Sequence, residues 1–261
     1  MKLFSCAVVC ALLPAAALAV DGVVLIDQNR VLAGNITPGD MPGFPATITL
    51  PGSYRLSGNL TVPNFNAHGI AIQSDHVTLD LNGFAILGPT DCSGGLNPCA
   101  GSGNGVGVLT DGAPPRFNIT VRNGTIQGLG SHGIFMRGDN FLLEDLHIRS
   151  NGSHGIFVSP SLDTGGSIIR HNTVQRNGDF GIFVPHAVIS QNIVSTNGGD
   201  GINVLRGAVA DNSSGQNGGY GLRGSPEVTY TGNSFQDNSS GSVIGPLLNG
   251  GGNNCNEVQC P

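Results

Sequence analysis

The sequence predicts an all-β protein, a parallel β-helix (solenoid) in which short strands stack along one axis between two caps. A Gly–apolar–x–apolar unit recurs along the chain, and its spacing shortens to 20 residues toward the C-terminus. Two asparagines five residues apart recur in step with it. The apolar runs are three to five residues long and alternate with period two, which is typical of strands rather than helices.

Residues 1–19 predict an export signal that is removed from the mature chain. Lys2 supplies a positive charge, an apolar run follows, and Ala17-Leu18-Ala19 is a small–x–small cleavage pattern. The apolar run is too short to span a bilayer, and no other run in the sequence is long enough. We therefore expect a secreted or periplasmic protein without a membrane span, whose mature chain begins at Val20.

Composition narrows the class of protein and of partner. Charged residues make up 11% of the chain, against about 25% in ordinary domains, and 42 of the 261 residues are glycine. The chain is long enough to bury one sizeable core. Its net charge of −6 gives no electrostatic reason to expect a nucleic acid partner.

Cysteine usage predicts local disulfides. Four cysteines remain after the predicted signal: Cys92, Cys99, Cys255 and Cys260. An even number in an exported chain suggests disulfides, and of the three pairings the local ones, Cys92–Cys99 and Cys255–Cys260, are the simplest. A zinc site is a weaker alternative, because neither pair has the CxxC spacing.

The glycine-led unit can be followed through seven copies. They begin at Gly69, Gly105, Gly133, Gly155, Gly181, Gly201 and, in a degenerate form, Gly221. The separations are 36, 28, 22, 26, 20 and 20 residues, so the early excess indicates inserted loops. The asparagine pairs that keep step are Asn172 and Asn177, Asn192 and Asn197, Asn212 and Asn217, and Asn233 and Asn238, with Asp145 and Asn151 as a looser copy.

A coil of this length defines the architecture. About 20 residues hold about three short strands with tight corners and leave no room for a helical crossover. Stacking the coils at the ~4.8 Å strand spacing pairs each strand with its copies above and below. Gly and Asn tolerate positive φ at tight corners, and Asn can hydrogen-bond up the stack. We therefore expect these asparagines to be structural ladders, not active-site residues.

The Gly-Ile-x-Val and Asn-x4-Asn repeat resembles the right-handed parallel β-helix (pectin-lyase-like) superfamily, which includes pectate lyases, polygalacturonases and mannuronan C-5 epimerases. Leu50–Val62 and Val77–Ile86 are similar to the opening of bacterial secreted β-helix repeat proteins of unassigned function. The resemblance covers about Thr47 to Gly245 and implies a right-handed stack of about seven to nine coils, in keeping with the hand of parallel crossovers.

Both ends of such a stack need a cap, because an open end exposes apolar edges. Val23–Ala33 has apolar residues spaced around polar ones and predicts a short amphipathic N-terminal capping helix. Leu247–Pro261, with its predicted disulfide, would cover the other end. The expected organisation is residues 1–19 signal, 20–46 N-terminal cap, 47–245 β-helix repeats and 246–261 C-terminal cap.

In each unit the two apolar residues should face inward and the residue between them outward. The expected buried stacks are Ile134, Ile156, Ile182 and Ile202, and Met136, Val158, Val184 and Val204. The outward positions are Ala71, Gly107, Phe135, Phe157, Phe183, Asn203 and Arg223. The residues just before each glycine form a second line: His68, Asn104, His132, His154, Phe180, Asp200 and Tyr220.

This surface is interpreted as a sugar-binding groove, because aromatic faces pack against sugar C–H surfaces and polar groups fix hydroxyls or carboxylates. The predicted substrate-binding residues are Phe135, Phe157, Phe183, His132, His154, Asp200, Asn203 and Arg223. Structural alternatives stay open: the rings are covered by residues 88–115 or by a neighbouring chain, or they only stabilise the sheet. His132 and His154 are either a transition-metal pair or hydrogen-bond partners of the backbone.

The catalytic motifs of the superfamily are incomplete in this sequence. Glycoside hydrolysis needs paired carboxylates, and the absence of an Asp-Asp pair disfavours a hydrolase. Pectate lyases use an acidic calcium cluster and a basic residue; Asp139, Glu144 and Asp145 lie near Arg137 and Arg149 in the sequence, but strand parity points several of these residues in different directions. Mannuronan epimerases carry Asp-Pro-His-Glu, of which Val184-Pro185-His186-Ala187 keeps Pro-His and lacks both acids.

The resemblance implies an exported carbohydrate-binding or carbohydrate-processing protein. The activity to test is a lyase-like reaction on a uronate polysaccharide, for which the resemblance implies calcium as the cofactor. The sequence assigns no catalytic residue and leaves open whether the protein is an enzyme. The main alternative is a non-catalytic structural or adhesin-like surface solenoid, and a periplasmic metal-accessory role rests only on the His line.

Overall fold

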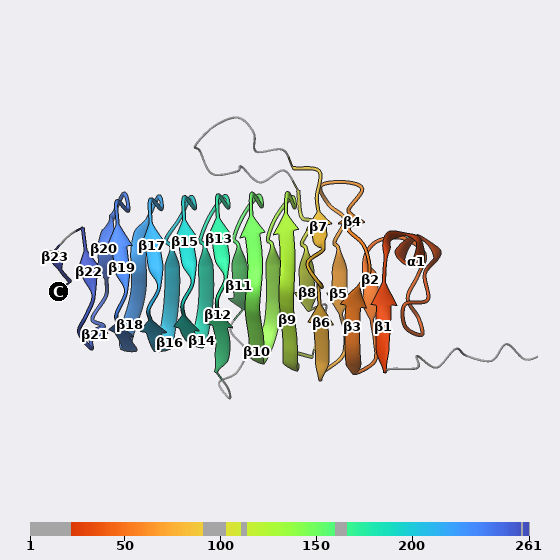
Figure 1. The fold of residues 1–261 in the computed structure, drawn as a ribbon, viewed down its shortest axis with the longest axis horizontal. Helices are drawn as coiled ribbons and strands as arrows, with labels where there is room; N and C mark the ends of the chain where they lie inside the picture. Colours follow the sequence, from red (N-terminus) through yellow and green to blue (C-terminus); the bar gives the residue numbers. More distant parts are fainter. Residues whose placement is uncertain (1–21, 91–102, 111–113, 160–165, 257, 261) are drawn as a thin grey trace, which may run out of the picture.

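The computed structural model describes residues 22–90, 103–110, 114–159, 166–256 and 258–260. These residues form a parallel β-solenoid of about 9 turns with one short helix, so the predicted fold class is confirmed. Figure 1 shows the strands side by side along the long axis, with α1 (Gln28–Ala33) at one end and β23 (Val258–Gln259) at the other. The chain passes through three sheets in each turn, which are called here the first, second and third sheet.

The strands of each sheet are paired in parallel with the equivalent strands of the next turn. The first sheet contains β2 (Ala46–Ile48), β5 (Ile70–Ile72), β8 (Val108–Thr110), β11 (Ile156–Ser159), β20 (Gly241–Ile244) and the first parts of β10 (Ile134–Arg149), β14 (Ile182–Ser190), β16 (Ile202–Ala210) and β18 (Tyr220–Thr231). The second contains β1 (Val23–Ile26), β3 (Gly52–Leu56), β6 (Val77–Asp80), β12 (Ser167–Arg170), β21 (Leu248–Asn249), the start of β9 (Arg116–Gln127), the middle of β10 and the later parts of β14, β16 and β18.

The third sheet is built from shorter strands. It contains β4 (Leu60–Thr61), β7 (Ala85–Leu87), β13 (Thr173–Gln175), β15 (Ile193–Ser195), β17 (Ser213–Gly215), β19 (Ser234–Gln236), β22 (Asn254–Cys255) and the ends of β9 and β10. The last strand, β23 (Val258–Gln259), pairs with β22 in the antiparallel direction. Several strands, such as β10, β14, β16 and β18, run from one sheet into the next.

The core is a set of columns along the axis. Ile134, Ile156, Ile182 and Ile202 are in register on successive turns, and all four are fully buried. Met136, Val158, Val184 and Val204 form the second column and are also buried. Strand parity was therefore predicted correctly for these turns, because a one-residue slip would have exposed both columns.

One copy of the repeat was assigned to the wrong glycine. Ile70 pairs with Val108 and Val108 with Ile134, so the glycine of this turn is Gly107 and not Gly105. The separations from Gly69 and to Gly133 become 38 and 26 residues. The outward residue of the turn is then Leu109, and Val106 replaces Asn104 in the second line. Both are nearly buried, and Ala71 beside Leu109 is only 1% exposed.

Two asparagine ladders run inside the corners of the third sheet. In one, Asn151, Asn177, Asn197, Asn217 and Asn238 lie one above another, and each side-chain Nδ2 donates to the Oδ1 of the next at 2.9 or 3.0 Å. The other contains Asn172, Asn192, Asn212, Asn233 and Asn253 with the same bonds. The side chains are almost completely buried, so their predicted structural role is confirmed.

The ladder asparagines do not take the strained backbone conformation of the corners, contrary to expectation. Positive φ falls on the preceding residue, for example His171 (φ 56°), Gln191 (φ 56°) and Thr196 (φ 58°). Asp145 also has this conformation (φ 54°). It is not a looser ladder member, because the ladder position of that turn is Leu146, whose N–H donates to Asn172 Oδ1.

The two ends of the described chain are capped by different means. The predicted helix over Val23–Ala33 is wrong in its first part: Val23–Ile26 is β1, and the helix α1 covers Gln28–Ala33. Asp27 separates them, because its carboxylate accepts the N–H of Arg30 as an N-cap. At the other end the predicted disulfide Cys255–Cys260 is confirmed, with an S–S distance of 2.06 Å.

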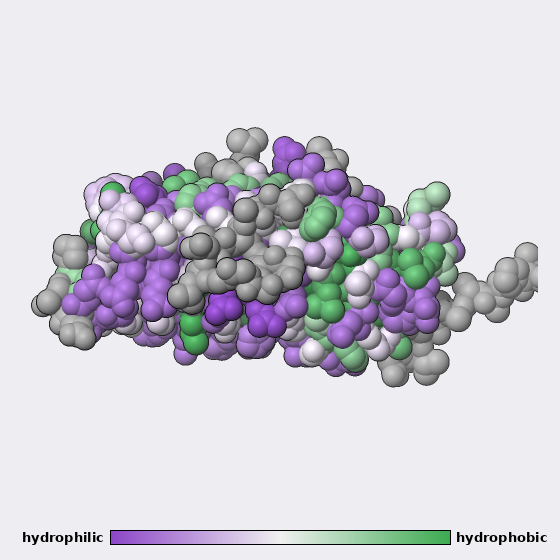
Figure 2. Space-filling model, turned by 90° about the horizontal axis from the view of Figure 1, so that it is seen from above, coloured by the Kyte–Doolittle hydropathy of each residue, from purple (hydrophilic) through white to green (hydrophobic). Residues whose placement is uncertain are grey.

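Two predictions concern residues outside the described part of the chain. The signal peptide and the Cys92–Cys99 disulfide lie outside the described residues. Within the described ranges, no helix has the length and apolar content needed to cross a membrane. Figure 2, seen from above, shows a mainly hydrophilic surface with separate hydrophobic patches.

Replacing Asn197 with Ala should lower the free energy of unfolding by about 3 kcal/mol or more. The change leaves the buried amide groups of Asn177 and the carbonyl of Val174 without their partner, and each unsatisfied buried group costs about 1–3 kcal/mol. Urea unfolding measures the effect. Ser195→Ala, on the adjoining strand, should change stability by less than about 0.5 kcal/mol; equal midpoints for the two variants would contradict the ladder's role.

Candidate functional site

The predicted aromatic line exists and is a double ladder of rings on the first sheet. In one column Phe135, Phe157 and Phe183 have ring centroids 5.6 and 5.0 Å apart. In the other, His132, His154 and Phe180 are separated by 4.9 and 5.0 Å. Neighbouring rings are close to parallel, within 7–16° inside each column.

This geometry means that the rings lie face to face along the axis. Two coplanar rings side by side would need centroids roughly 6 Å apart or more, because their edge carbons cannot approach closer than ~3.5 Å. Phe157 therefore has both faces covered by Phe135 and Phe183, and all three are half-buried. The expected binding mode, in which sugars stack on successive ring faces, is not available within the column, because neighbouring rings cover these faces. Only the ring edges face outward.

The histidines of the second column hold the backbone of the next turn. His132 Nδ1 accepts the N–H of His154 at 3.3 Å, and His154 Nδ1 accepts the N–H of Phe180 at 3.1 Å. His68 makes the same contact with Val106 at 3.2 Å. An acceptor Nδ1 is a nitrogen without a proton, so these imidazoles are neutral in the folded state. Of the two readings of this pair, backbone hydrogen bonding is the one observed.

Burial keeps the imidazoles of His132 and His154 neutral at acidic pH. Desolvation lowers the pKa of His132 from 6.5 to about 4, and the neighbouring His154 acts in the same direction. Desolvation also lowers the pKa of His154 from 6.5 to about 4. Asp179 Oδ2 lies 3.6 Å from His154 Nδ1, and burial raises the pKa of the Asp179 carboxyl.

The polar residues predicted to bind substrate at the C-terminal end of the aromatic line interact with one another. Asp200 is 3% exposed; its Oδ1 accepts the N–H of Tyr220 at 2.7 Å and its Oδ2 accepts Arg223 Nε at 2.6 Å. The Arg223 guanidinium lies 5.1 Å from the centroid of the Tyr220 ring. Asn203 is 7% exposed. The structure thus brings all eight predicted substrate-binding residues onto one sheet, with several of their polar atoms engaged inside the stack.

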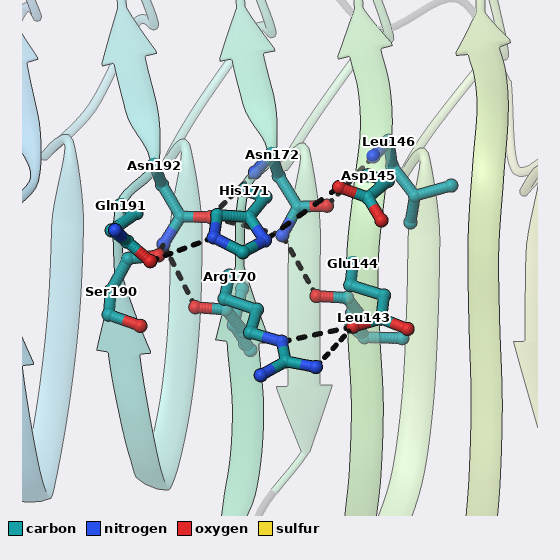
Figure 3. Close-up of polar contacts among 11 residues, drawn as sticks. Leu143, Glu144, Asp145, Leu146, Arg170, His171, Asn172, Ser190, Gln191 and Asn192 are labelled. Carbon is teal, nitrogen blue, oxygen red and sulfur yellow. Dashed lines mark hydrogen bonds and ion pairs between the residues drawn. The ribbon is translucent and has the colours of Figure 1, made fainter.

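The acidic residues considered for a calcium cluster do not converge. Figure 3 shows Glu144 turned toward Arg170 and Asp145 toward His171. Arg170 Nη2 lies 2.7 Å from Glu144 Oε2, and His171 Nδ1 lies 3.7 Å from Asp145 Oδ1. Among the described residues, no three His, Cys, Asp or Glu side chains form a cluster able to hold a metal ion.

Glu144 and Arg170 belong to a charge ladder that sequence analysis missed. Arg55, Asp80, Arg122, Glu144 and Arg170 occupy one outward column of the second sheet on successive turns. Asp80 lies within 4.0 Å of Arg55 and 3.5 Å of Arg122. Their spacing in sequence ranges from 22 to 42 residues, so the alternation is visible only once the register is known.

A groove follows the corner between the first and second sheets and is called here the corner groove. Its volume is about 320 Å³. Its lining comes from five successive turns: Gly138, Asp139, Val158, Ser159, Ser167, Pro185, His186, Leu205, Arg206, Ser225 and Glu227. Pro185-His186, the part of the epimerase motif that the sequence keeps, lies at its centre. Arg206 forms an ion pair with Glu227 of the next turn.

The corner groove continues onto the second sheet. An adjoining hollow shares Ser167, His186 and Arg206 with it and adds Ile168 and Val188, which are 43% and 48% exposed. Hydrogen-bonding side chains and exposed apolar side chains therefore lie next to each other. Sequence analysis identified Pro185-His186 but missed Arg206 and Glu227, because a register shift between Val204 and Arg206 breaks the 20-residue spacing at this corner.

Comparison with known families identifies the fold. A family model described as "Right handed beta helix region" matches residues 52–213, more than half of the chain. The chain therefore belongs to the right-handed β-helix family, and the predicted resemblance is confirmed. No curated protein matches it in sequence.

Solved structures with the same fold are distant in sequence. A point mutant of the periplasmic alginate epimerase AlgG has a TM-score of 0.52 at 13% identity, with 87% of this chain and 66% of that chain covered. The A-module of the Azotobacter vinelandii mannuronan C-5 epimerase AlgE6 gives 0.47 at 13% identity, covering 82% and 77%, and the Dettilon tailspike protein gives 0.45 at 14%, covering 82% and 59%. The chain thus spans less than two thirds of the AlgG and tailspike structures, and at these identities the likeness shows the fold alone.

Stability should fall as the pH is lowered from about 6.5 toward 4. In this window the unfolded state protonates His132 and His154 while the folded state does not, so stability rises with pH. The raised pKa of Asp179 acts in the opposite direction at the acidic end, so urea unfolding is best compared at pH about 7 and about 5.

The double variant His132→Asn, His154→Asn provides the control. An Asn side chain can accept the same backbone N–H but does not titrate. The variant should lose less stability than the wild type between the two pH values. An identical loss in both proteins would show that other groups cause the pH dependence.

Proposed function

We propose that this member of the right-handed β-helix family is an exported protein that binds a polysaccharide chain along the corner groove. The observation that carries the proposal is the shape of the site, a groove lined by five successive turns and running along the axis. Turns repeat at ~4.8 Å, which is close to the length of one sugar unit in a polymer. Successive turns can therefore contact successive sugars.

The lining of the groove suits a carbohydrate. Ser159, Ser225 and His186 present hydroxyl and imidazole groups that can hydrogen-bond to sugar hydroxyls. Ile168 and Val188, exposed beside the groove, offer apolar contact to the C–H faces of sugar rings. The mixture of a few polar groups with apolar side chains is typical of small-molecule and sugar sites.

An acidic polysaccharide is the substrate class to test first. AlgG, whose structure has the same fold, is an alginate epimerase, and alginate is a uronate polymer. The corner groove contains Arg206, whose five N–H donors allow contact with a carboxylate beside its ion pair with Glu227, and His186, which can accept a proton. Lyase and epimerase reactions on uronates both begin with removal of a proton beside the carboxylate, so His186 is the candidate base if the protein turns over its ligand.

A second candidate surface is the double ring ladder with the eight residues predicted from the sequence. Its ring edges and the half-buried His132 and His154 face outward on the first sheet. Its main observed role is internal, because Nδ1 of both histidines and the carboxylate of Asp200 bind the next turn. This observation favours a structural solenoid on that face.

The double variant His186→Ala, Arg206→Ala should weaken binding of pectate or alginate about tenfold or more, since loss of a charged hydrogen bond alone accounts for about that factor. Isothermal titration with and without calcium measures affinity, and product analysis of the same samples detects turnover. The matched control is His171→Asn, Arg176→Asn at the two exposed corners on either side of β13, where both residues have positive φ, which Asn tolerates; it should bind like the wild type.

Phe157→Ala separates the two surfaces. If the ring ladder is structural, the variant should melt at a lower temperature and keep its affinity, because Phe157 loses four stacked ring contacts. Weaker binding by Phe157→Ala at an unchanged melting temperature would move the site to the first sheet. If the wild type binds no polysaccharide, the proposal fails and the structural solenoid remains.

A further inference from the structure

The third sheet carries a separate groove that the corner groove does not include. Its volume is about 420 Å³, and it is lined by Thr125, His147, Arg149, Thr173 and Gln175. These residues come from three adjacent turns and lie in two outward columns. His147 is in register with Thr125 and Thr173, while Arg149 is in register with Gln127 and Gln175. The groove is called here the third-sheet groove.

The side chains of this groove leave most of their hydrogen-bonding capacity unused. Arg149 Nε donates to Gln127 Oε1 at 2.8 Å. Within the described part of the chain, the terminal nitrogens of Arg149 and the side chains of His147 and Gln175 have no further partner. On the other two sheets the comparable groups are engaged: Asp200 with Arg223, and Glu144 with Arg170.

The bond to Gln127 also orients the guanidinium. It fixes Nε on the side of the previous turn, and this leaves the two terminal nitrogens as a pair of parallel donors. Such a pair matches the two oxygens of a carboxylate or sulfate, which Arg binds in bidentate fashion. A side chain that is already held in its binding geometry loses less entropy on binding.

The local charge is positive although the chain has a net charge of −6. None of the five lining residues is acidic. The acidic residues before His147 on the same strand point elsewhere: Asp145 lies 3.7 Å from His171 at the corner, and Glu144 is paired with Arg170 on the second sheet (Figure 3). An anion in the groove would therefore meet Arg149 without competition from a neighbouring carboxylate.

We propose that the third-sheet groove binds the charged group of an anionic sugar chain, a uronate carboxylate or a sulfate ester, with Arg149 as the anchor. His147, Thr173 and Gln175 then hydrogen-bond to the adjacent sugar hydroxyls. This site lies on a different sheet from the corner groove, and it extends the proposed function by a second, charge-selective contact for a polymer.

The test is made in the His186→Ala, Arg206→Ala background, so that the corner groove does not contribute. Isothermal titration uses three probes: polygalacturonate for the carboxylate, dextran sulfate for the sulfate ester and neutral dextran as reference. Adding Arg149→Gln should weaken binding of the charged probes about tenfold or more, and neutral dextran should not bind. The charged probe that binds more tightly identifies the preferred group.

Arg176→Gln is the matched control, because it removes the same charge from an exposed corner residue just outside the groove. It should change affinity less than about twofold, as expected for an unpaired surface charge. Equal losses of affinity for Arg149→Gln and Arg176→Gln would show that the effect is non-specific electrostatic attraction, and would contradict the proposed site. If neither polyanion binds the background protein, the site is overturned as well. Failure of the corner-groove proposal is distinguishable, because the background protein would then bind the polyanions as tightly as the wild type does.

Discussion

The buried asparagine ladders are the interaction on which the rest of this structure depends. The chain must change direction at the corners of each turn, where backbone groups cannot all pair within the sheets. Asn197, for example, accepts the backbone N–H of Asn177 and donates to the carbonyl of Val174. Because an unpaired buried group is costly, a turn that carries these asparagines is most stable when they coincide with those of the next turn. In the turn before each ladder begins, Leu129 and Leu146 take the same positions and donate their N–H groups to Asn151 and Asn172. The ladders therefore fix the register, and the register places every outward residue in a column.

Columns give each sheet its own chemistry. On the first sheet, phenyl and imidazole rings stack face to face. The acceptor atoms of His132, His154 and Asp200 accept hydrogen bonds from backbone N–H groups of the next turn. On the second, acids and arginines alternate and neutralise one another. In both cases the stack uses its own polar groups. Ligand binding is better supported where these groups are left over, as they are for Arg149 on the third sheet.

Much of the fold could be predicted because its causes repeat in the sequence. The Gly–apolar–x–apolar units and the asparagine pairs specify the coil, the core columns and the ladders. Errors arose where the repeat is ambiguous or local chemistry intervenes: Gly105 and Gly107 both precede a valine, and Asp27 caps a helix inside an apparently continuous pattern. Ring orientation has no sequence signal. The partners Arg206 and Glu227 were missed because an irregular register brings them together.

The repeat also limits the kind of ligand that either groove can take. The corner groove collects side chains from five turns and the third-sheet groove from three, and each runs along the axis. A small molecule would contact one or two turns, and the remaining side chains would stay solvated. A polymer whose units match the ~4.8 Å spacing of the turns can engage all of them, with each weak contact made at the effective concentration set by its neighbours. Binding by a solenoid of this design should therefore strengthen as the chain length of the ligand increases.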